Sequence, residues 1–445
     1  MAGGTWTSQN KIRPGVYIRF KTNAALGLAA GDRGTVTICE PLSWGPAGKV
    51  IEVEAGTDMT PITGYDITDP ANLFLQQIFA GSNRTAAPKK VLLYNPNNTG
   101  ATQATVSIPP LTATAAYAGT RGNDITIIVT ALTDPEDSFQ VSTVVAGNIV
   151  DQQTAKQVED LVDNEWATFA GTGTLAASAG KAMSGGSNGT ANADAYSAYL
   201  TAIEPYKFDV MIYDGKDTTV MQAMQRFIQR IAEEAGVYAQ LVMANATAPD
   251  SRFVINVMSG FTLSDGTELT PQQACWWVGG AEAGALYNQS LTYASVPGAV
   301  SASPMMTNSE YEKALQSGQL VLFADDGVVK IEQDINGLVT YTTDIGKVFR
   351  KNRVMRLCNT IANDIYKTFS TSYIGVVNNN EAGRSQFKAA IVGYLLDLQA
   401  NSGIQNFTAD DVEVLPGDDI DAIVVNIAIQ AVDSIEKIYM TIEVS

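Results

Sequence analysis

The sequence predicts a mixed α/β (α+β) core domain, an inserted, mainly β, sandwich-like domain, and extended strand arms at the N and C termini. Three observations favour this fold class. Helix and strand patterns alternate between Thr190 and Thr307, and the composition shifts to Thr, Ala, Ser and Gly between Asn97 and Gly189. Both ends of the chain alternate apolar with polar residues, which indicates strands.

The length of the chain predicts several structural units. At 445 residues it exceeds the roughly 250 to 300 residues at which a single hydrophobic core stops growing. We expect an N-terminal arm (1–24), a first core segment (25–96), the β-sandwich-like insertion (97–189), an α/β core (190–340), a C-terminal core domain with long helices (341–432) and a C-terminal arm strand (433–445).

The segment before the insertion predicts three strands and one helix. Near the N terminus, side chains alternate as in a strand with one buried face: Val16, Ile18 and Phe20 against Tyr17, Arg19 and Lys21. The apolar runs "GTVTICE" (34–40) and "KKVLLYNP" (89–96) predict the other strands. The stretch "DPANLFLQQIFAGS" (69–82) predicts a helix, because Asp69 can cap it, Pro70 suits its first position and Gly81 can end it.

The insertion contains strand-like runs in "DITIIVTAL" (124–132) and "FQVSTVV" (139–145). One helix is predicted over "QTAKQVEDLVDNEWATF" (153–169), and the loose "SGGSNG" (184–189) leads out. A mainly β domain follows from this pattern.

The following segment alternates helices with strands. Helices are predicted over 191–204, 218–236 and 270–286, and strands over "FDVMIYD" (208–214) and "YAQLVMA" (238–244). Thr270 and Gln273 surround Pro271 as a capping box at the start of the third helix. The alternation predicts helices packed on a central sheet.

The last part of the chain predicts a hairpin around Asp325, Asp326 and Gly327, then two long helices over 346–369 and 382–400, the second closed by Gly403. Strands follow. The stretch "DAIVVNIAIQ" places Ile423, Val425, Ile427 and Ile429 on one face, and the final "IEKIYMTIEVS" does the same with Ile438, Met440, Ile442 and Val444.

Composition excludes several classes of function. The chain has no histidine, which removes Ser-His-Asp and Cys-His nucleophile pairs, His-based metal sites and imidazole acid/base chemistry. Its three cysteines, Cys39, Cys275 and Cys358, are too far apart for a CxxC site. A net charge of -18 argues against a nucleic-acid or membrane-surface binder. With neither a signal pattern nor a long apolar stretch, we expect no membrane insertion and a cytoplasmic chain.

For each candidate catalytic or binding site, the residues can also be explained by a structural role. The loop "AGTRGN" (118–123) resembles a phosphate cradle, but a strand follows it where a helix is needed, so a tight connection is favoured. Solvated turns are favoured over catalysis or metal binding at three acidic pairs: Asp325/Asp326, Asp410/Asp411 and Asp418/Asp419. Trp276, Trp277 and Tyr287 suit core or inter-subunit packing better than a ligand site. We assign no catalytic residue, metal or cofactor.

A basic cluster stands out in this acidic chain. The stretch "KVFRKNRVMR" (347–356) holds five basic residues and no acidic one: Lys347, Arg350, Lys351, Arg353 and Arg356. It lies near the start of a predicted helix, where the macrodipole disfavours cations. Two explanations stay open, namely pairing with the chain's own carboxylates and contact with an acidic partner.

Several stretches in order resemble the contractile tail sheath family of myophages, tailocins and related injection particles, above all the sheaths of Gram-positive prophages. They are "RPGVYIRF", "RGTVTICEPLSWGP", "AAYAGTRGNDITIIV", "DINGLVTYTTDIGKVFRKNRVMRLCNTIANDI" and "AIQAVDSIEKIYMTIEV". Together they cover nearly the whole chain.

The resemblance implies a structural subunit that polymerises around a tail tube as a six-fold helical lattice and contracts to drive the tube through a cell envelope. It implies a core nearest the tube, an outer β-sandwich, and terminal arms whose strands complete a sheet on another subunit. The N-terminal arm maps onto Gly15, Val16, Tyr17, Ile18, Arg19, Phe20 and Lys21. The C-terminal arm maps onto Glu436, Lys437, Ile438, Tyr439, Met440, Thr441, Ile442, Glu443 and Val444.

The implied partners are further copies of the chain, the tail tube protein, and the baseplate and tail terminator proteins. The basic cluster is the hypothesised tube contact. The implied location is the host bacterial cytoplasm during assembly and then the phage tail or tailocin particle. The alternatives are an α/β enzyme using acidic residues and a divalent metal, and another lattice protein such as a tail tube or surface-layer subunit.

Overall fold

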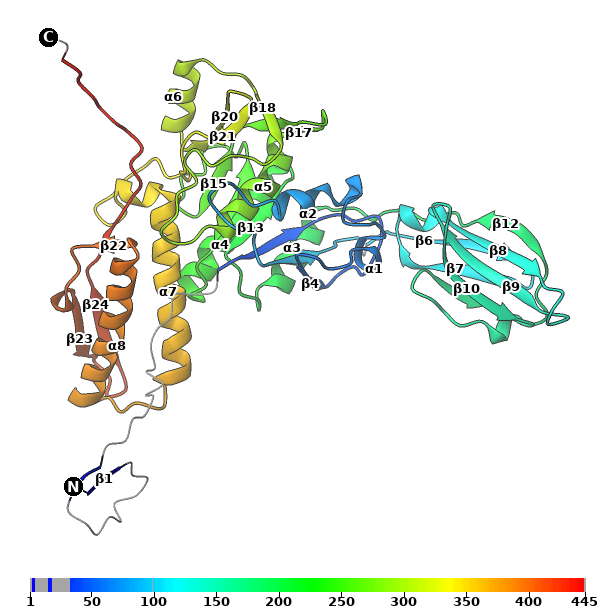
Figure 1. Cartoon of the computed structure of the whole chain (residues 1–445), viewed down its shortest axis with the longest axis horizontal. Helices are drawn as coiled ribbons and strands as arrows, with labels where there is room; N and C mark the ends of the chain where they lie inside the picture. Colours follow the sequence, from blue (N-terminus) through cyan, green and yellow to red (C-terminus); the bar gives the residue numbers. More distant parts are fainter. Residues whose placement is uncertain (1, 5–14, 18–32, 98, 444–445) are drawn as a thin grey trace. The chain divides into compact units, whose positions relative to one another are not determined.

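The computed structural model describes residues 2–4, 15–17, 33–97 and 99–443 (Figure 1). The chain divides into two compact units. The larger unit comprises Gly31–Asn363 and Ala431–Ser445, and the smaller unit comprises Met1–Ala30 and Asp364–Gln430.

A seven-stranded sheet forms the centre of the larger unit, in the order β19-β15-β14-β13-β3-β5-β4. Only β4 runs antiparallel to its neighbour in this sheet. The strands are β3 (Thr35–Cys39), β4 (Val50–Glu54), β5 (Lys90–Tyr94), β13 (Val210–Tyr213), β14 (Gln240–Ala244), β15 (Val254–Val257) and β19 (Gln319–Leu320). All residues of β13, β14 and β15 are buried, as expected for parallel strands covered on both faces.

Helices cover the two faces of this sheet. Val210 and Ile212 of β13 pack in one apolar cluster with α2 (Leu73–Ile78) and α5 (Pro271–Gly284), and Met211 and Tyr213 pack in another with α3 (Ala193–Ile203) and α4 (Thr218–Glu234). The predicted capping box of Thr270 and Gln273 is confirmed. Asp69 caps a short 3-10 turn, η1 (Pro70–Asn72), which precedes α2. The short helix α1 (Thr60–Thr63) lies between β4 and η1.

The insertion is a β-sandwich of a four-stranded sheet (β10-β9-β8-β12) and a three-stranded sheet (β11-β7-β6), seen at one end of Figure 1. Its elements are β6 (Gln103–Ile108), β7 (Leu111–Ala118), η2 (Thr120–Asp124), β8 (Ile125–Ala131), β9 (Phe139–Val145), β10 (Asn148–Ala155), η3 (Val158–Asp160), β11 (Ala167–Ala170) and β12 (Ser178–Ala182). Apolar residues of both sheets form one buried cluster. The predicted fold class is therefore confirmed.

The helix predicted over 153–169 is wrong. Its start lies in β10, which pairs with β9, and its end lies in β11, which pairs with β7; η3 is the only helical turn between them. The two ends of this stretch pair with neighbouring strands, and this tertiary pairing outweighs the local helical preference.

The remainder of the larger unit contains short elements. These are β16 (Gly260–Leu263), β17 (Glu268–Leu269), β18 (Ala299–Ser303), α6 (Asn308–Gln316), β20 (Leu322–Asp325), β21 (Val328–Ile331) and η4 (Lys347–Arg350). The predicted hairpin is confirmed: Asp325 lies opposite Val328, and Asp326 and Gly327 adopt φ values of 49° and 74° in the turn.

The helix predicted from Gly346 is interrupted. The turn η4 ends at Arg350, Lys351 is extended, and α7 (Asn352–Ser372) begins after it. Lys351 forms an antiparallel bridge with Ile335, which requires extended backbone at this position.

The smaller unit contains the end of α7, α8 (Glu381–Ala400) and an antiparallel pair of β23 (Val412–Pro416) and β24 (Ile423–Ile427). Asn380 caps α8, and the Tyr394 hydroxyl of α8 donates to Asp364 of α7 at 2.8 Å. The remaining elements are β22 (Ile404–Gln405), η5 (Ala409–Asp411) and β25 (Gln430–Ala431).

The two ends of the chain differ in what is described. Gly15–Tyr17 form β2, which pairs in parallel with β1 (Ala2–Gly4). Ile18 to Lys21 of the predicted N-terminal arm, and Val444 of the C-terminal arm, lie outside the described residues. Residues 432–443 form no strand within the described chain, since a strand needs a hydrogen-bonded partner. The domain boundaries stay a prediction.

Candidate functional site

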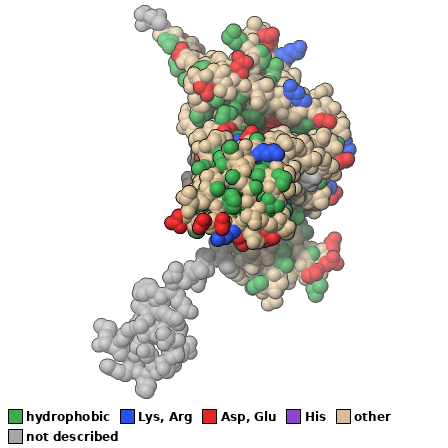
Figure 2. Space-filling model, turned by 90° about the vertical axis from the view of Figure 1, so that its right-hand side faces the viewer, with side chains coloured by type: hydrophobic (Ala, Val, Ile, Leu, Met, Phe, Trp, Pro, Cys, Tyr) green, Lys and Arg blue, Asp and Glu red, His purple; other side chains and the backbone are tan. Residues whose placement is uncertain are grey.

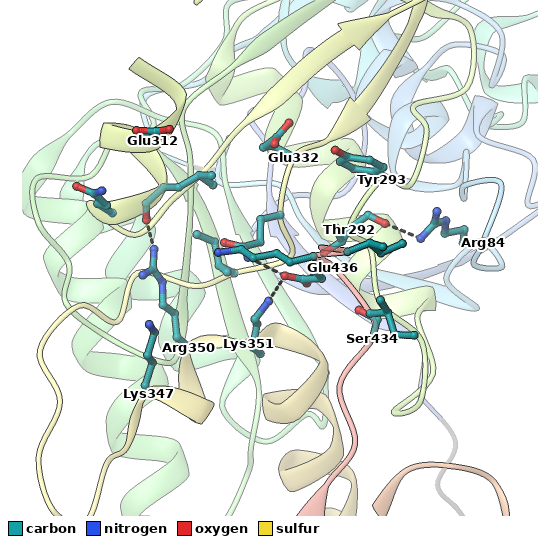
Figure 3. Close-up of a pocket in the computed structure, with 17 residues that line it drawn as sticks. Arg84, Thr292, Tyr293, Glu312, Glu332, Lys347, Arg350, Lys351, Ser434 and Glu436 are labelled. Atoms are coloured by element: carbon teal, nitrogen blue, oxygen red, sulfur yellow. Dashed lines mark hydrogen bonds and ion pairs between the residues drawn. The ribbon is translucent and has the colours of Figure 1, made fainter. Parts of the chain in front are cut away.

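A cavity of about 890 Å³ lies in the larger unit, where the C-terminal arm leaves the folded body. We call it the anchor cavity (Figure 3). Its lining combines basic and acidic side chains with part of the arm itself: Arg84, Thr292, Tyr293, Glu312, Leu315, Gln316, Glu332, Gln333, Ile335, Lys347, Arg350, Lys351, Ser434, Ile435, Glu436, Lys437 and Ile438.

The Glu436 carboxylate is held in this cavity by three side-chain donors. The Thr292 hydroxyl donates to Oε1 at 2.8 Å, and the Gln333 amide donates to Oε2 at 2.7 Å. The Lys351 ammonium pairs with the same Oε2, and Figure 3 shows the two side chains pointing toward one another. The Glu436 side chain is only 11% exposed, so this is a nearly buried, charge-assisted contact.

Local structure places each donor. Thr292 lies beyond the end of α5, Gln333 follows β21, and Lys351 occupies the extended position between η4 and α7. The bridge between Lys351 and Ile335 fixes the connector that carries the ammonium. Lys351 also lies 3.6 Å from the Asp433 carboxylate, so a second residue of the arm faces it.

A buried charge network lies beneath the anchor cavity. Arg356 of α7 pairs with Glu282 of α5 and, at 2.7 Å, with Asp334, and its side chain is 0% exposed. Asp334 also accepts the backbone N-H of Leu291 at 2.9 Å. Burial alone would lower the pKa of Arg356, but Asp334 and Glu282 outweigh burial and raise it. Burial raises the pKa of Glu282 although Arg356 opposes this effect.

The residues of the basic cluster do not form one exposed surface. Arg356 and Arg353 are buried, Arg350 donates to the Leu315 carbonyl, and Lys351 is bound to Glu436. Lys347 is exposed. The burial of Arg353 and Arg356 within the chain disfavours a direct partner contact at these two positions, and the tube contact of the cluster stays a prediction. Pairing with the chain's own carboxylates is confirmed for Lys351 and Arg356.

The described part of the C-terminal arm contacts the body of the protein through the side chains of Asp433 and Glu436. Its apolar side chains stand in solvent on both sides of Glu436, with Ile435 86%, Ile438 76%, Tyr439 91% and Ile442 76% exposed. The family resemblance maps Glu436 onto the inter-subunit arm, and in the structure its side chain binds its own chain.

The other candidate sites have structural roles. Trp276 and Trp277 are core residues whose indole N-H groups donate to Asp214 and to the Gly81 carbonyl, each at 2.8 Å. Arg121 of the "AGTRGN" loop donates to the Gly64 carbonyl at 3.0 Å and stacks over Tyr65 at 4.1 Å, which joins the sandwich to the core. Of the acidic pairs, Asp325/Asp326 lies at the hairpin turn, and Asp410/Asp411 lies in η5, where Asp411 accepts from Thr408 in a capping box.

One carboxyl pair is not predicted by the sequence pattern. Glu40 follows β3 and Asp214 follows the adjacent parallel strand β13, so their side chains meet at one edge of the sheet. Burial raises the pKa of both, and Asp214 raises the pKa of Glu40 further. The two residues are far apart in sequence, unlike the acidic pairs predicted above. The sequence shows a carboxyl residue at the end of each of two predicted strands. It does not show that these two strands are neighbours in the sheet, and so it does not predict the pair.

Two negative findings bear on function. Among the described residues, no group of three or more His, Cys, Asp or Glu side chains is arranged to hold a metal ion. The helices in the described ranges are all too short or too polar to span a lipid bilayer.

Four family models match the chain in succession. They are the tail sheath protein Gp18 domain III N-terminal region (33–95), the phage tail sheath protein beta-sandwich domain (98–188), the phage tail sheath protein central domain (189–337) and the phage tail sheath C-terminal domain (344–445).

Individual relatives agree with these models. The phage-like element PBSX protein XkdK of Bacillus subtilis is 34% identical, with 100% of both chains covered. The sheath tail protein of Desulfitobacterium hafniense has a crystal structure that superposes with a TM-score of 0.87 at 39% identity, covering 96% of this chain and 99% of that one. The helical sheath of the anti-feeding prophage in its contracted state shares the fold alone, with a TM-score of 0.58 at 14% identity over 98% of this chain and 99% of that one.

Proposed function

The chain belongs to the contractile tail sheath family, and from this premise we propose that it polymerises as a six-fold helical lattice around a tail tube and contracts to drive the tube through a target cell envelope. A structural role in a phage tail follows from the family. The six-fold symmetry, the contraction and the target are the proposal.

The exposed apolar end of the C-terminal arm is the observation that carries this proposal. Ile438, Tyr439, Met440 and Ile442 are each at least 75% exposed, and Ile438, Met440 and Ile442 alternate along the chain in the pattern of a strand. Such a segment has unpaired backbone groups and an apolar face, which a second chain can satisfy by pairing edge to edge. The arm is therefore suited to complete a sheet on a neighbouring copy.

The smaller unit offers a sheet that can accept a strand. β23 and β24 form a two-stranded sheet that packs on α8, and the outer edges of this pair have no strand partner among the described residues. Val424 and Leu415 of this pair are 47% and 40% exposed. An arm from a neighbouring copy would cover these side chains and add backbone hydrogen bonds.

The N-terminal arm, Gly15 to Lys21, is proposed to contribute a second strand to the same joint. Pairing of Gly15–Tyr17 with β1 supports this proposal, because these residues adopt strand geometry in that pair. Joints made of backbone pairing keep their register while subunits rotate, which suits a lattice that changes pitch.

Contraction needs no nucleotide in this proposal. Copies assemble in an extended lattice that is kinetically trapped, and the contracted lattice buries more complementary surface per copy. The partners are further copies, the tail tube protein, and the baseplate and tail terminator proteins. Assembly takes place in the host cytoplasm, and the finished subunit belongs to the tail particle.

The family assignment favours this structural role over the alternative of an α/β enzyme with acidic catalytic residues. The carboxyl groups of Glu40 and Asp214 are buried in the protein, with the Glu40 Oε2 atom enclosed by other protein atoms. A direct contact with an acidic tube surface stays a hypothesis for Lys347, which is exposed, with Arg350 and Lys351 beside it.

Negative-stain electron microscopy of the purified protein tests the proposal. We expect hollow tubes with six-fold end views at high protein concentration. Removal of Ile438 to Ser445 should leave a folded protein, by circular dichroism and melting temperature, that forms no tubes. Tubes of normal length after this deletion would falsify the arm assignment, and monodisperse monomers of the intact protein at every concentration would contradict the sheath proposal.

A further inference from the structure

We propose that Glu436 is the anchor of the C-terminal arm: its carboxylate, bound by Thr292, Gln333 and Lys351, fixes the point and direction at which the arm leaves the body. This inference rests on the proposed function, in which the arm links copies. A single side chain, that of Glu436, thereby fixes the link between copies, and the lattice forms only while this contact is intact.

The carboxylate of Glu436 makes all three contacts with the body of the protein. Oε1 accepts from Thr292, and Oε2 accepts from Gln333 and pairs with Lys351. The Lys351 and Glu436 side chains are 22% and 11% exposed, so water competes weakly for this contact. Hydrogen bonds to a charged and partly buried group are the stronger kind in proteins.

Polar contacts connect the bound Glu436 carboxylate to the buried core of the larger unit. The Thr292 hydroxyl that donates to Glu436 also accepts the backbone N-H of Asp334 at 3.0 Å. The Asp334 carboxylate in turn pairs with Arg356, which pairs with Glu282 of the buried helix α5. A pull on the arm is thus carried through fixed polar contacts into the core of the larger unit.

The anchor, Glu436, lies shortly before the solvent-exposed end of the arm. Asp433 and Glu436 face Lys351, whereas Tyr439 and the described residues after it stand in solvent. Among the described residues, Glu436 is the last of the arm with a polar side-chain contact to the body, and Lys437 and Ile438 still border the anchor cavity. The nine residues Lys437 to Ser445 reach about 30 Å as an extended strand, which limits the acceptor to a sheet edge within that distance of the anchor cavity.

The rate at which trypsin cleaves after Lys437 measures how firmly Glu436 is bound in the unassembled protein. Cleavage after Lys437 releases Ile438 to Ser445, and the bound carboxylate next to Lys437 should hold this site away from the protease. We expect Glu436→Gln and Lys351→Met each to speed this cleavage by at least about tenfold, because cleavage follows the population of the open form. The double variant should be little faster than either single variant, since both remove one interaction.

Glu312→Gln is the matched control. Glu312 lines the same cavity and accepts a hydrogen bond from Asn308 within α6, so its replacement removes the same charge without a contact to the arm. This variant should be cleaved at the rate of the unaltered protein. Equal cleavage rates for Glu436→Gln and Glu312→Gln would overturn the anchor, whatever the protein assembles into.

Electron microscopy of the same variants tests whether the anchor serves the lattice. We expect Glu436→Gln, with an unchanged melting temperature, to form few or short tubes where Glu312→Gln forms normal ones. Faster cleavage of Glu436→Gln combined with normal tubes would overturn the proposal, because the lattice would then form without the Glu436 contact. If the unaltered protein forms no tubes, the proposed function fails, and this inference fails with it even where the cleavage rates identify a local contact.

Discussion

Arg356 places a positive charge in the interior of the protein, where Glu282 and Asp334 surround it. The free energy of such a cluster is the balance of a large desolvation penalty and strong attraction. Removal of the cation leaves two buried carboxylates close together without a counter-charge. The cluster therefore ties α7 to α5 and to the segment around Asp334, and any change in one member affects the others.

Replacement of Arg356 should reveal this dependence. We expect Arg356→Met to lower the free energy of unfolding by about 3 to 5 kcal/mol, the usual effect of breaking a buried pair. Urea denaturation followed by circular dichroism measures it. The exposed pair of Arg230 and Glu204 supplies the control, since Arg230→Met should change stability little. A small effect at Arg356 would mean that the buried carboxyls simply take up protons.

The Glu40 and Asp214 pair is a second buried electrostatic element. Its neighbours are Cys39, Tyr196, Tyr213 and Cys275, and burial raises the pKa of each of them, so all stay uncharged near neutral pH. Asp214 accepts the Trp276 indole N-H, which favours its charged form. Glu40 is then the member that retains a proton in the folded state.

This pair predicts a pH dependence of stability. The folded-state pKa of Glu40 lies above its unfolded value of about 4, so the stabilising contribution is complete below about pH 4 and is lost as the pH rises toward the folded pKa. Glu40→Gln mimics the protonated form, and its melting temperature should therefore fall less between pH 5 and pH 8. The exposed Glu52 gives the control Glu52→Gln. Parallel curves for Glu40→Gln and the unaltered protein would refute this assignment.

At the scale of elements, close backbone contact explains the glycines of α5. A Cβ atom on Gly280 would lie 2.0 Å from the Ile78 carbonyl of α2, and one on Gly284 would lie 2.1 Å from the Ala86 carbonyl. These distances are far below van der Waals contact. The two helices can pack on the sheet side by side only because α5 presents bare backbone to α2.

Two glycine-to-alanine changes in helices should have opposite signs. Gly280→Ala forces α2 and α5 apart and should destabilise the protein by about 1 to 3 kcal/mol, as overpacking does. A Cβ atom on Gly393 in α8 would meet no heavy atom within 4 Å, and Gly393→Ala should stabilise by about 0.5 to 1 kcal/mol. Thermal and urea unfolding measure both. The same sign for both variants would contradict the packing argument.

At the scale of the whole molecule, the net charge of -18 sets how copies meet. Figure 2 shows Asp and Glu side chains at separate places over one face, with Lys and Arg side chains between them. Like-charged copies repel one another at low salt, and screening reduces this repulsion. Contacts between copies should therefore depend on backbone pairing and apolar burial more than on charge.

Contact with the tail tube should depend on salt in the opposite way, if Lys347 faces an acidic tube surface. Sheath assembly on isolated tubes should weaken as salt rises from about 50 to 500 mM, and Lys347→Glu should remove most of that dependence. Sedimentation of tubes with bound sheath measures it. Lys216→Glu is a control at another exposed lysine, which follows β13. Unchanged assembly of Lys347→Glu at low salt would exclude the tube contact.

Patterns local in the sequence determined most of the elements. The capping box at Thr270, the turn at Asp326 and Gly327, and the strands and helices of the core depend on residues within a few positions of one another. The same locality explains the failure at 153–169, where helical spacing competes with strand pairing to β9 and β7 that no local pattern reveals. It also explains why the family resemblance could be detected without the fold.

The sequence by itself determined the fold class, the absence of histidine chemistry and the strand pattern of the C-terminal arm. Only the tertiary structure decided which charges of the basic cluster are buried and where the arm begins. Glu436 contacts Thr292, 144 positions away, and Arg356 contacts Glu282, 74 positions away. The partners of a charge are set by the packing of distant elements, and the free energy of that charge depends on whether the packing leaves it in water or encloses it.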